Sequence, residues 1–148
     1  MPKGKWTDKV QREDFDRMVK RGLTAVGAFL VGDAMPRCPK VTGRLRGSIT
    51  WATNKKKSSP IAPAESGDAV SRPTDKYTCY VGTNVEYAQT VEYGQSGRGE
   101  RTSLKTRRTA KATGGRPAKP YLRPALDENR KEVREIFGRE IKAVLHGK

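Results

Sequence analysis

Residues 77–94 read YTCYVGTNVEYAQTVEYG, and this stretch decides the fold because its periodicity changes halfway along. From 77 to 83, side chains alternate between two faces, which predicts a strand that Gly82 ends. From 85 to 93, apolar side chains recur at helical spacing, which predicts a short helix with Gly94 as its terminator. A strand followed at once by a helix is therefore the centre of the predicted fold.

A partner strand is predicted upstream, at residues 49–53, where side chains alternate in the same way. Thr42 and Gly43 precede it and suit a turn or the start of a helix. Residues 54–76 contain three consecutive lysines and three prolines, which is typical of a long mobile loop. We expect the two strands to pair antiparallel across this loop.

Two long helices are predicted to flank the strands. Residues 12–35 place apolar side chains on one face, and Pro36 and Pro39 are expected to end this helix. Residues 124–146 show a second apolar stripe, and Pro124 suits the first turn. The first stripe comprises Phe15, Met18, Val19, Gly22, Leu23, Val26, Phe29 and Leu30, and the second comprises Leu126, Val133, Ile136, Phe137, Ile141, Val144 and Leu145.

These elements predict an α+β fold. A small antiparallel sheet is packed by a long N-terminal helix, a short middle helix and a C-terminal helix, with two long loops at 54–76 and 95–119. Residues 1–148 are expected to form a single domain. Hydrophobic residues make up only 34% of the chain and a sheet this small has exposed edges, so we expect an oligomer on stability grounds.

The formal net charge of +15 is concentrated in two inner segments. Residues 37–57 contain seven basic residues and no acid, and residues 94–123 contain nine basic residues and one acid, Glu100. Such an excess favours contact with polyanions or with acidic protein surfaces, while a solvated basic face is the simpler alternative.

The segment 95–119 has Leu104 as its one strongly apolar residue, so it cannot form a core of its own. It is expected to be a disordered arm or a hairpin that orders against another subunit. Its cations could contact DNA phosphates or an acidic neighbour without reading sequence, or could be solvated. These candidate DNA-lumen or inter-subunit contacts are Arg98, Arg101, Lys105, Arg107, Arg108, Lys111 and Arg116.

No catalytic, metal or cofactor site is predicted. The one histidine, His146, lies at the frayed end of the last helix, and the six-residue spacing of Glu86 and Glu92 puts them on different helix faces. Cys38 and Cys79 fit no zinc pattern and are expected to be buried free thiols. No apolar run is long enough for a membrane span and the N-terminus has no signal-peptide core, so we expect a soluble protein made in a cytosol.

Three separated segments carry a resemblance to a known family. Residues 41–49 (VTGRLRGSI) are similar to a P-x-x-T-G-x-L-R-x-S-I pattern, and residues 81–94 to V-G-T-x-x-x-Y-A-x-x-x-E-x-G. Residues 117–126 (PAKPYLRPAL) are similar to P-x-P-F-L-x-P-A-L. Together they resemble the tail-completion and head–tail connector proteins of long-tailed bacteriophages. The fold or interface residues in these segments are Thr42, Gly43, Leu45, Ser48, Ile49, Gly82, Tyr87, Ala88, Glu92, Tyr93, Gly94, Pro120, Leu122 and Pro124.

Within these segments the residues also have physical interpretations. Gly43 and Gly82 are expected to permit backbone turns, and Leu45 and Ile49 to enter the core. Tyr87 and Tyr93 can pack a ring while offering a hydroxyl to a partner.

The resemblance implies a structural, non-enzymatic virion protein, assembled in the bacterial cytoplasm. It implies a homo-oligomeric ring, expected to be a hexamer, in the phage neck. The ring would contact the portal–connector (stopper) proteins and the tail-terminator or tail-tube proteins, and would leave a channel for double-stranded DNA. Two alternatives stay open: a sequence-independent nucleic-acid-binding protein, and a small enzyme that would need His146, Glu86 or Glu92.

Overall fold

The computed structural model describes residues 8–40, 43–95 and 115–146. The chain folds into a mixed α+β structure, which confirms the predicted class. The elements in order are α1 (Asp8–Arg37), α2 (Arg44–Ser48), β1 (Thr50–Thr53), the 3₁₀ helix η1 (Ser66–Asp68), β2 (Cys79–Gly82), α3 (Ala88–Tyr93), α4 (Leu122–Glu128) and α5 (Arg130–His146).

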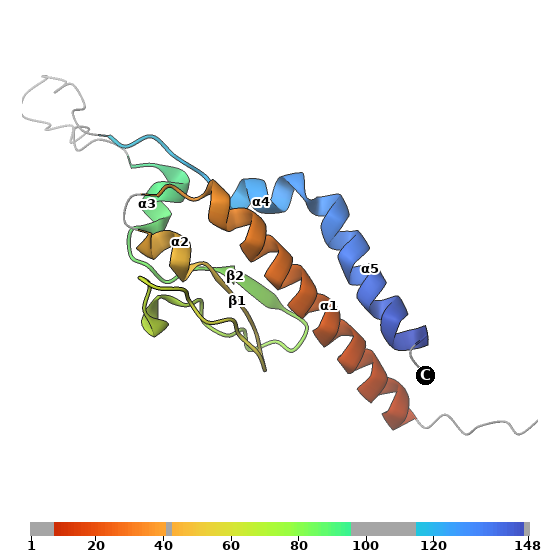
Figure 1. Ribbon diagram of the computed structural model, residues 1–148. Helices are drawn as coiled ribbons and strands as arrows, with labels where there is room; N and C mark the ends of the chain where they lie inside the picture. The colour runs from red at the N-terminus through yellow and green to blue at the C-terminus, as the bar shows by residue number, and fades with distance from the viewer. Residues whose placement is uncertain (1–7, 41–42, 96–114, 147–148) are drawn as a thin grey trace, which may run out of the picture.

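Helix α1 is the central element of the molecule (Figure 1). The sheet packs on one side of α1 and α5 packs on the other. Gly27 allows the close approach of the sheet, because a Cβ atom at this position would lie 2.9 Å from the Cys79 sulfur and 3.0 Å from Trp51. The short helices α2 and α3 gather around the C-terminal end of α1, where α4 begins (Figure 1).

The helix α1 extends beyond the predicted range of 12–35, and Pro36 lies inside it. The amide of Cys38 still donates to the carbonyl of Ala34, at 3.1 Å, so helical bonding continues past the proline. Pro36 lacks an amide hydrogen and so removes one helical donor, but the bond from Cys38 to Ala34 forms past it. The helix therefore ends at Arg37, between the two predicted terminators, and the prediction that Pro36 itself stops it is wrong.

The two strands pair antiparallel, as predicted, with Thr50 opposite Gly82 and Thr53 opposite Cys79. Both strands are shorter than the predicted ranges of 49–53 and 77–83. Gly82 ends β2, as predicted, but its φ is not positive and a Cβ atom there would meet Val70 at an ordinary 3.9 Å, so the expectation that the backbone needs glycine at this position is wrong. Gly43 does adopt a φ of +77°, which favours glycine, and starts α2.

Residues 54–76 are fastened to the body of the protein, which corrects the prediction of a mobile loop. The amide of Ser58 donates to the Trp51 carbonyl at 2.9 Å, and the amide of Ile61 donates to the Gly47 carbonyl at 2.8 Å. Near the other end of the segment, Asp68 accepts from the amide of Asn84 at 2.8 Å. Irregular backbone can be fixed in this way once its polar groups find partners.

The predicted helix 124–146 is two helices, because α4 ends before Asn129 and α5 starts after it. The Asn129 side-chain amide donates to the Ala125 carbonyl and to the Asp33 carboxylate, both at 2.9 Å. Its own carbonyl accepts from the amide of Val133 at 2.9 Å. An asparagine side chain that bonds the local backbone competes with helix continuation, and here it also ties the break to α1.

Candidate functional site

The three segments that carry the resemblance meet at one place in the fold. Each contributes two buried side chains to a single apolar cluster, which we call the motif junction. Ala34 and Cys38 near the end of α1 complete the cluster. The six motif residues are Leu45, Ile49, Val85, Ala88, Tyr121 and Ala125. The prediction that Leu45 and Ile49 enter the core is thus confirmed.

The first segment is anchored by an ion pair that the sequence analysis missed. Arg44 donates two parallel hydrogen bonds to the Asp68 carboxylate, at 2.8 and 2.7 Å, across 24 residues of sequence. Asp68 is 6% exposed and also accepts from the amide of Glu65 at 3.1 Å. Bidentate geometry fixes orientation as well as distance, so this pair positions η1 against α2.

The second segment is anchored by hydroxyl and amide groups. Thr83 and the fully buried Ser48 are hydrogen-bonded through their hydroxyls at 2.6 Å. The Asn84 side-chain amide donates to the Ala69 carbonyl at 2.7 Å. Thr83 and Asn84 thus hold the first motif and the 54–76 segment together, a function that no local pattern indicated.

Glu92 connects the second segment to the third. It is 6% exposed, and its carboxylate accepts from the amides of Tyr121, Leu122 and Arg123 at 2.8, 3.1 and 3.0 Å. These are the amides at the start of α4, which have no partner inside the helix. The fourth position of that turn is Pro124, which has no amide hydrogen. Glu92 and Pro124 together therefore leave no unsatisfied donor in the first turn.

The remaining motif residues lie around the junction. Tyr87 and Tyr93 are 40% and 58% exposed, and the Arg123 guanidinium stacks over the Tyr93 ring at 4.4 Å. Pro120 is exposed and Leu122 is half-buried. Gly94 ends α3 with a φ of +78°. Thr42 lies outside the described residues.

The electrostatics of the Arg44–Asp68 pair follow from its geometry. The Arg44 hydrogen bonds, with the Glu65 amide, lower the pKa of Asp68, and the same pair raises the pKa of Arg44. A carboxylate whose pKa is lower in the folded state stabilises the fold when the pH is above the pKa of an unfolded aspartate, about 3.9. This stabilisation is lost as the pH falls through the lower pKa of the folded state.

We expect Asp68→Asn to lower the thermal midpoint at pH 7, and the difference from the wild type to shrink as the pH falls below about 4. Thermal melts at pH 7, 5 and 3 would measure this. The control is Asp127→Asn, which changes an exposed carboxylate near Arg130. A midpoint difference that stays constant over this pH range would contradict the electrostatic account.

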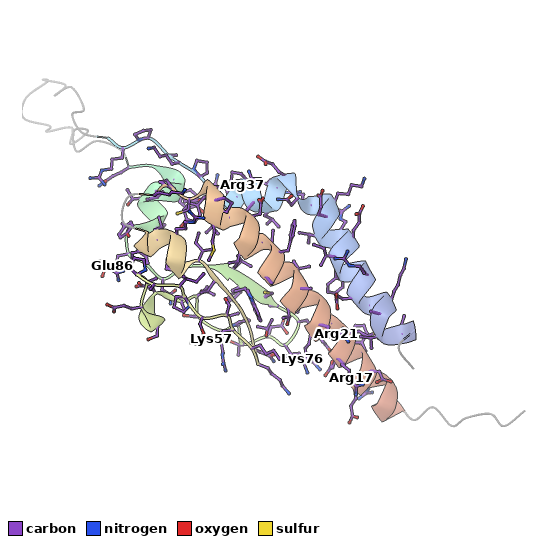
Figure 2. All side chains as sticks on the ribbon, viewed as in Figure 1. Arg17, Arg21, Arg37, Lys57, Lys76 and Glu86 are labelled. Atoms are coloured by element: carbon purple, nitrogen blue, oxygen red, sulfur yellow. The ribbon has the colours of Figure 1, made fainter. Side chains whose placement is uncertain are left out.

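The two thiols are not suited to nucleophilic chemistry. Cys38 is buried and Cys79 is half-buried, and burial raises the pKa of each to about 11. Thiols with such a pKa stay protonated at neutral pH. The candidate carboxylates also have separate environments, since Glu92 is engaged in the cap and Glu86 points outward (Figure 2). No group of acidic, histidine or cysteine side chains suited to a metal ion occurs in the described part of the chain.

An apolar groove of about 720 Å³ lies beside the motif junction, and we call it the β2 groove. Leu23, Val26 and Leu30 of α1 line it together with the whole of β2. Tyr80, Tyr93 and Leu126 also line it and are 47%, 58% and 47% exposed.

One edge of β2 has no backbone partner among the described residues. On β1, Trp51 and Thr53 bond residues 56–58, so their backbone groups point away from β2. Bonding directions alternate along an antiparallel strand, so the other two residues of β1, Thr50 and Ala52, must bond their partners Gly82 and Tyr80. The backbone groups of Cys79 and Val81 are left at the open edge, and both residues line the β2 groove.

The candidate contact residues in 95–119 fall mostly outside the part of the chain that the structure describes. Arg98, Arg101, Lys105, Arg107, Arg108 and Lys111 lie outside the described residues. Arg116 is exposed and pairs with Gln95 through two backbone hydrogen bonds of 2.9 Å. Gln95 and Arg116, which are 21 residues apart in sequence, are therefore held side by side.

Comparison with known proteins gives one family. The family model HK97-gp10_like, described as "Bacteriophage HK97-gp10, putative tail-component", matches residues 7–94. This range is more than half of the chain and ends just after Glu92. No curated protein and no solved structure matches. No helix among the described residues is long and apolar enough to cross a membrane.

Proposed function

This chain belongs to the HK97-gp10-like family of bacteriophage tail components, and from this premise we propose that it is a neck subunit that forms an oligomeric ring. The ring completes the head-proximal end of the tail, docks onto the connector and leaves a channel for DNA. Its neighbours are the portal–connector (stopper) proteins and the tail-terminator or tail-tube proteins. It is assembled in the host cytoplasm and has no catalytic activity.

The observation that carries the ring is the open edge of β2 beside the β2 groove. An unpaired strand edge next to an apolar surface favours pairing with another chain. Some residues of the predicted apolar stripes also remain outside the core. Phe15 is 52% exposed and Leu126 is 47% exposed. A single copy thus leaves apolar surface that identical copies could cover. Six copies is the number that the family resemblance implies.

Leu126→Arg is expected to abolish ring assembly while leaving the monomer folded, because Leu126 is half-exposed and lines the β2 groove. Native mass spectrometry and negative-stain electron microscopy, with and without the neighbouring neck proteins, would measure assembly. Circular dichroism would check that the fold is retained.

The matched control is Leu145→Arg, which introduces the same charge at an exposed leucine outside the groove. A wild-type chain that stays monomeric even with its neck partners would overturn the ring. If the Leu126→Arg variant assembles into rings as well as the Leu145→Arg variant does, the β2 groove is not the contact between subunits.

A further inference from the structure

A second hollow, distinct from the β2 groove, lies between the N-terminal half of α1 and the turn that follows β1. Its volume is about 470 Å³, and we call it the basic hollow. Five cations and one acid line it. The cations are Arg17, Lys20, Arg21, Lys55 and Lys56, and the acid is Glu140 of α5. Figure 2 shows Arg17 and Arg21 on the part of α1 that lies beside the C-terminal end of α5.

The fold fixes the two sides of the basic hollow. On one side, α1 presents Arg17, Lys20 and Arg21 within about one turn. On the other side, a tight turn holds Lys55 and Lys56. The amide of Thr53 donates to the Lys56 carbonyl at 2.7 Å, and the amide of Lys56 donates to the Thr53 hydroxyl at 3.1 Å. The lysines are therefore placed by a bonded turn.

The charges of the basic hollow are poorly neutralised. Lys20, Lys55 and Lys56 form no ion pair within 4 Å among the described residues. Arg17 lies 3.8 Å from Asp14, and Arg21 lies 3.4 Å from Glu140, with both arginines more than half exposed. Exposed pairs at such distances contribute little.

Two arginines elsewhere in the fold have closer acidic partners. Arg37 is 2.8 Å from Asp33 and 2.6 Å from Glu128, and Arg44 is held by Asp68 at 2.7 Å. Those arginines connect elements of the fold. In the basic hollow, by contrast, Arg21 reaches Glu140 of α5 at 3.4 Å, and the three lysines have no ion pair within 4 Å among the described residues.

The lining of the basic hollow also indicates the kind of anion. Its remaining residues are Thr24, Ala25, Ala28 and Thr53, which are small and leave room for a bulky group. Among the described residues no aromatic side chain lines it, so this lining offers nothing on which an unpaired base could stack. Lysines act as flexible point charges that bind phosphates without reading sequence.

We propose that the basic hollow binds the phosphate backbone of double-stranded DNA. This inference rests on the proposed function, in which DNA passes through the ring and the hollow faces the channel. The proposal assigns DNA contact to α1 and to the turn at residues 53–56, in addition to any contact by the basic residues of the segment 95–119.

The test compares the full-length chain with the Lys20→Ala/Lys55→Ala/Lys56→Ala variant, by fluorescence anisotropy with a labelled 30-base-pair duplex of mixed sequence. Three lost phosphate contacts are expected to weaken binding at least tenfold at low salt. The logarithm of the association constant falls as the logarithm of the salt concentration rises, and the variant should make this slope shallower by roughly 2.7. The Lys→Arg variant at the same three positions should retain binding, because it keeps the charge.

A matched control removes three exposed cations outside the basic hollow, as Arg72→Ala/Lys131→Ala/Arg134→Ala. Its duplex affinity should stay within about twofold of the wild type, since these residues are not in the proposed contact. If the hollow variant binds DNA with the affinity and salt slope of this control, the proposal is wrong.

Native mass spectrometry on the same samples separates this inference from the ring. Loss of DNA affinity with an unchanged oligomer supports the basic hollow as a DNA site. A hollow variant that keeps its DNA affinity but no longer assembles would show a subunit contact and overturn the proposal. A wild-type chain that stays monomeric yet binds DNA through these lysines would refute the ring and leave the DNA site standing.

Discussion

Substitution of Glu92 by alanine is expected to lower the free energy of unfolding by about 3 kcal/mol, since each buried donor left without a partner costs about 1–3 kcal/mol. Three amides, those of Tyr121, Leu122 and Arg123, depend on this one carboxylate. Because Glu92 also lines the β2 groove, water can reach part of the vacated space. We therefore place the cost at the lower end of the range.

The position of Glu92 at the start of α4 adds an electrostatic reason to expect that Glu92→Ala destabilises the fold. The start of a helix carries a partial positive charge from its unpaired amides, and a carboxylate there is stabilising. In most helices the capping group comes from the adjacent residue, but here it comes from α3, about 30 residues earlier in the chain. Glu92→Ala therefore removes the cap of α4 and also the link between α3 and the C-terminal half of the chain.

Urea unfolding at a fixed protein concentration, followed by tryptophan fluorescence, would measure the effect. Glu92→Gln keeps the size of the side chain but turns an amide group toward the donors, so we expect an intermediate loss of stability. The control is Glu86→Ala, which removes an exposed carboxylate from the segment just before α3. If Glu92→Ala and Glu86→Ala unfold at the same urea concentration, the cap does not stabilise the fold as proposed.

The features that sequence patterns predicted correctly are those fixed by local periodicity. The alternation in 77–83 and 49–53 identified both strands and their antiparallel pairing. Helical spacing identified α1 and α3, and also the region of α4 and α5, although as one helix. Gly94 was correctly predicted as the end of α3. Each of these depends on residues within one or two turns, which a single sequence displays directly.

The features that the patterns missed depend on partners far away in sequence. Arg44 and Asp68 are separated by a segment that read as a mobile loop, and neither residue signals the other. The break at Asn129 depends on Asp33 of α1, which supplies the acceptor that holds it. Pro36 read as a terminator because its own chemistry disfavours helix, yet the last turn tolerates it.

The sequence indicates the motif residues but not their contacts. It makes Glu92 part of the family resemblance and a candidate acid–base group, and the structure shows that its carboxylate caps α4. In the sequence, the cations Arg17, Lys20 and Arg21 lie between the members of the apolar stripe of residues 12–35, as is ordinary for the polar face of an amphipathic helix. Their relation to Lys55 and Lys56 appears only when the turn after β1 is folded against α1.

The second large effect is expected at Gly47, where an added methyl group has no space. A Cβ atom on Gly47 would lie 2.1 Å from the carbonyl oxygen of Ile61, far inside van der Waals contact. The same stretch of backbone donates to the Gly47 carbonyl from the Ile61 amide at 2.8 Å. The obstacle is main chain, so a change of rotamer cannot relieve the clash.

We therefore expect Gly47→Ala to destabilise the protein by about 3 kcal/mol, which combines overpacking of about 1–3 kcal/mol with a weakened hydrogen bond of about 1 kcal/mol. Because residues around Ile61 would have to move away from α2, the segment 54–76 should become susceptible to limited proteolysis. Urea unfolding and a timed protease digest with mass spectrometry would record the two effects.

Gly32→Ala is the matched control, because it makes the same substitution within a helix where nothing lies within 4 Å of the added Cβ atom. Alanine has the higher helix propensity, so this variant should be more stable than the wild type by about 0.5–1 kcal/mol. Opposite signs for the two glycines would show that the close approach of Ile61, and not helix propensity, requires glycine at position 47. If Gly47→Ala is also stabilising, the packing of the 54–76 segment against α2 is not as described.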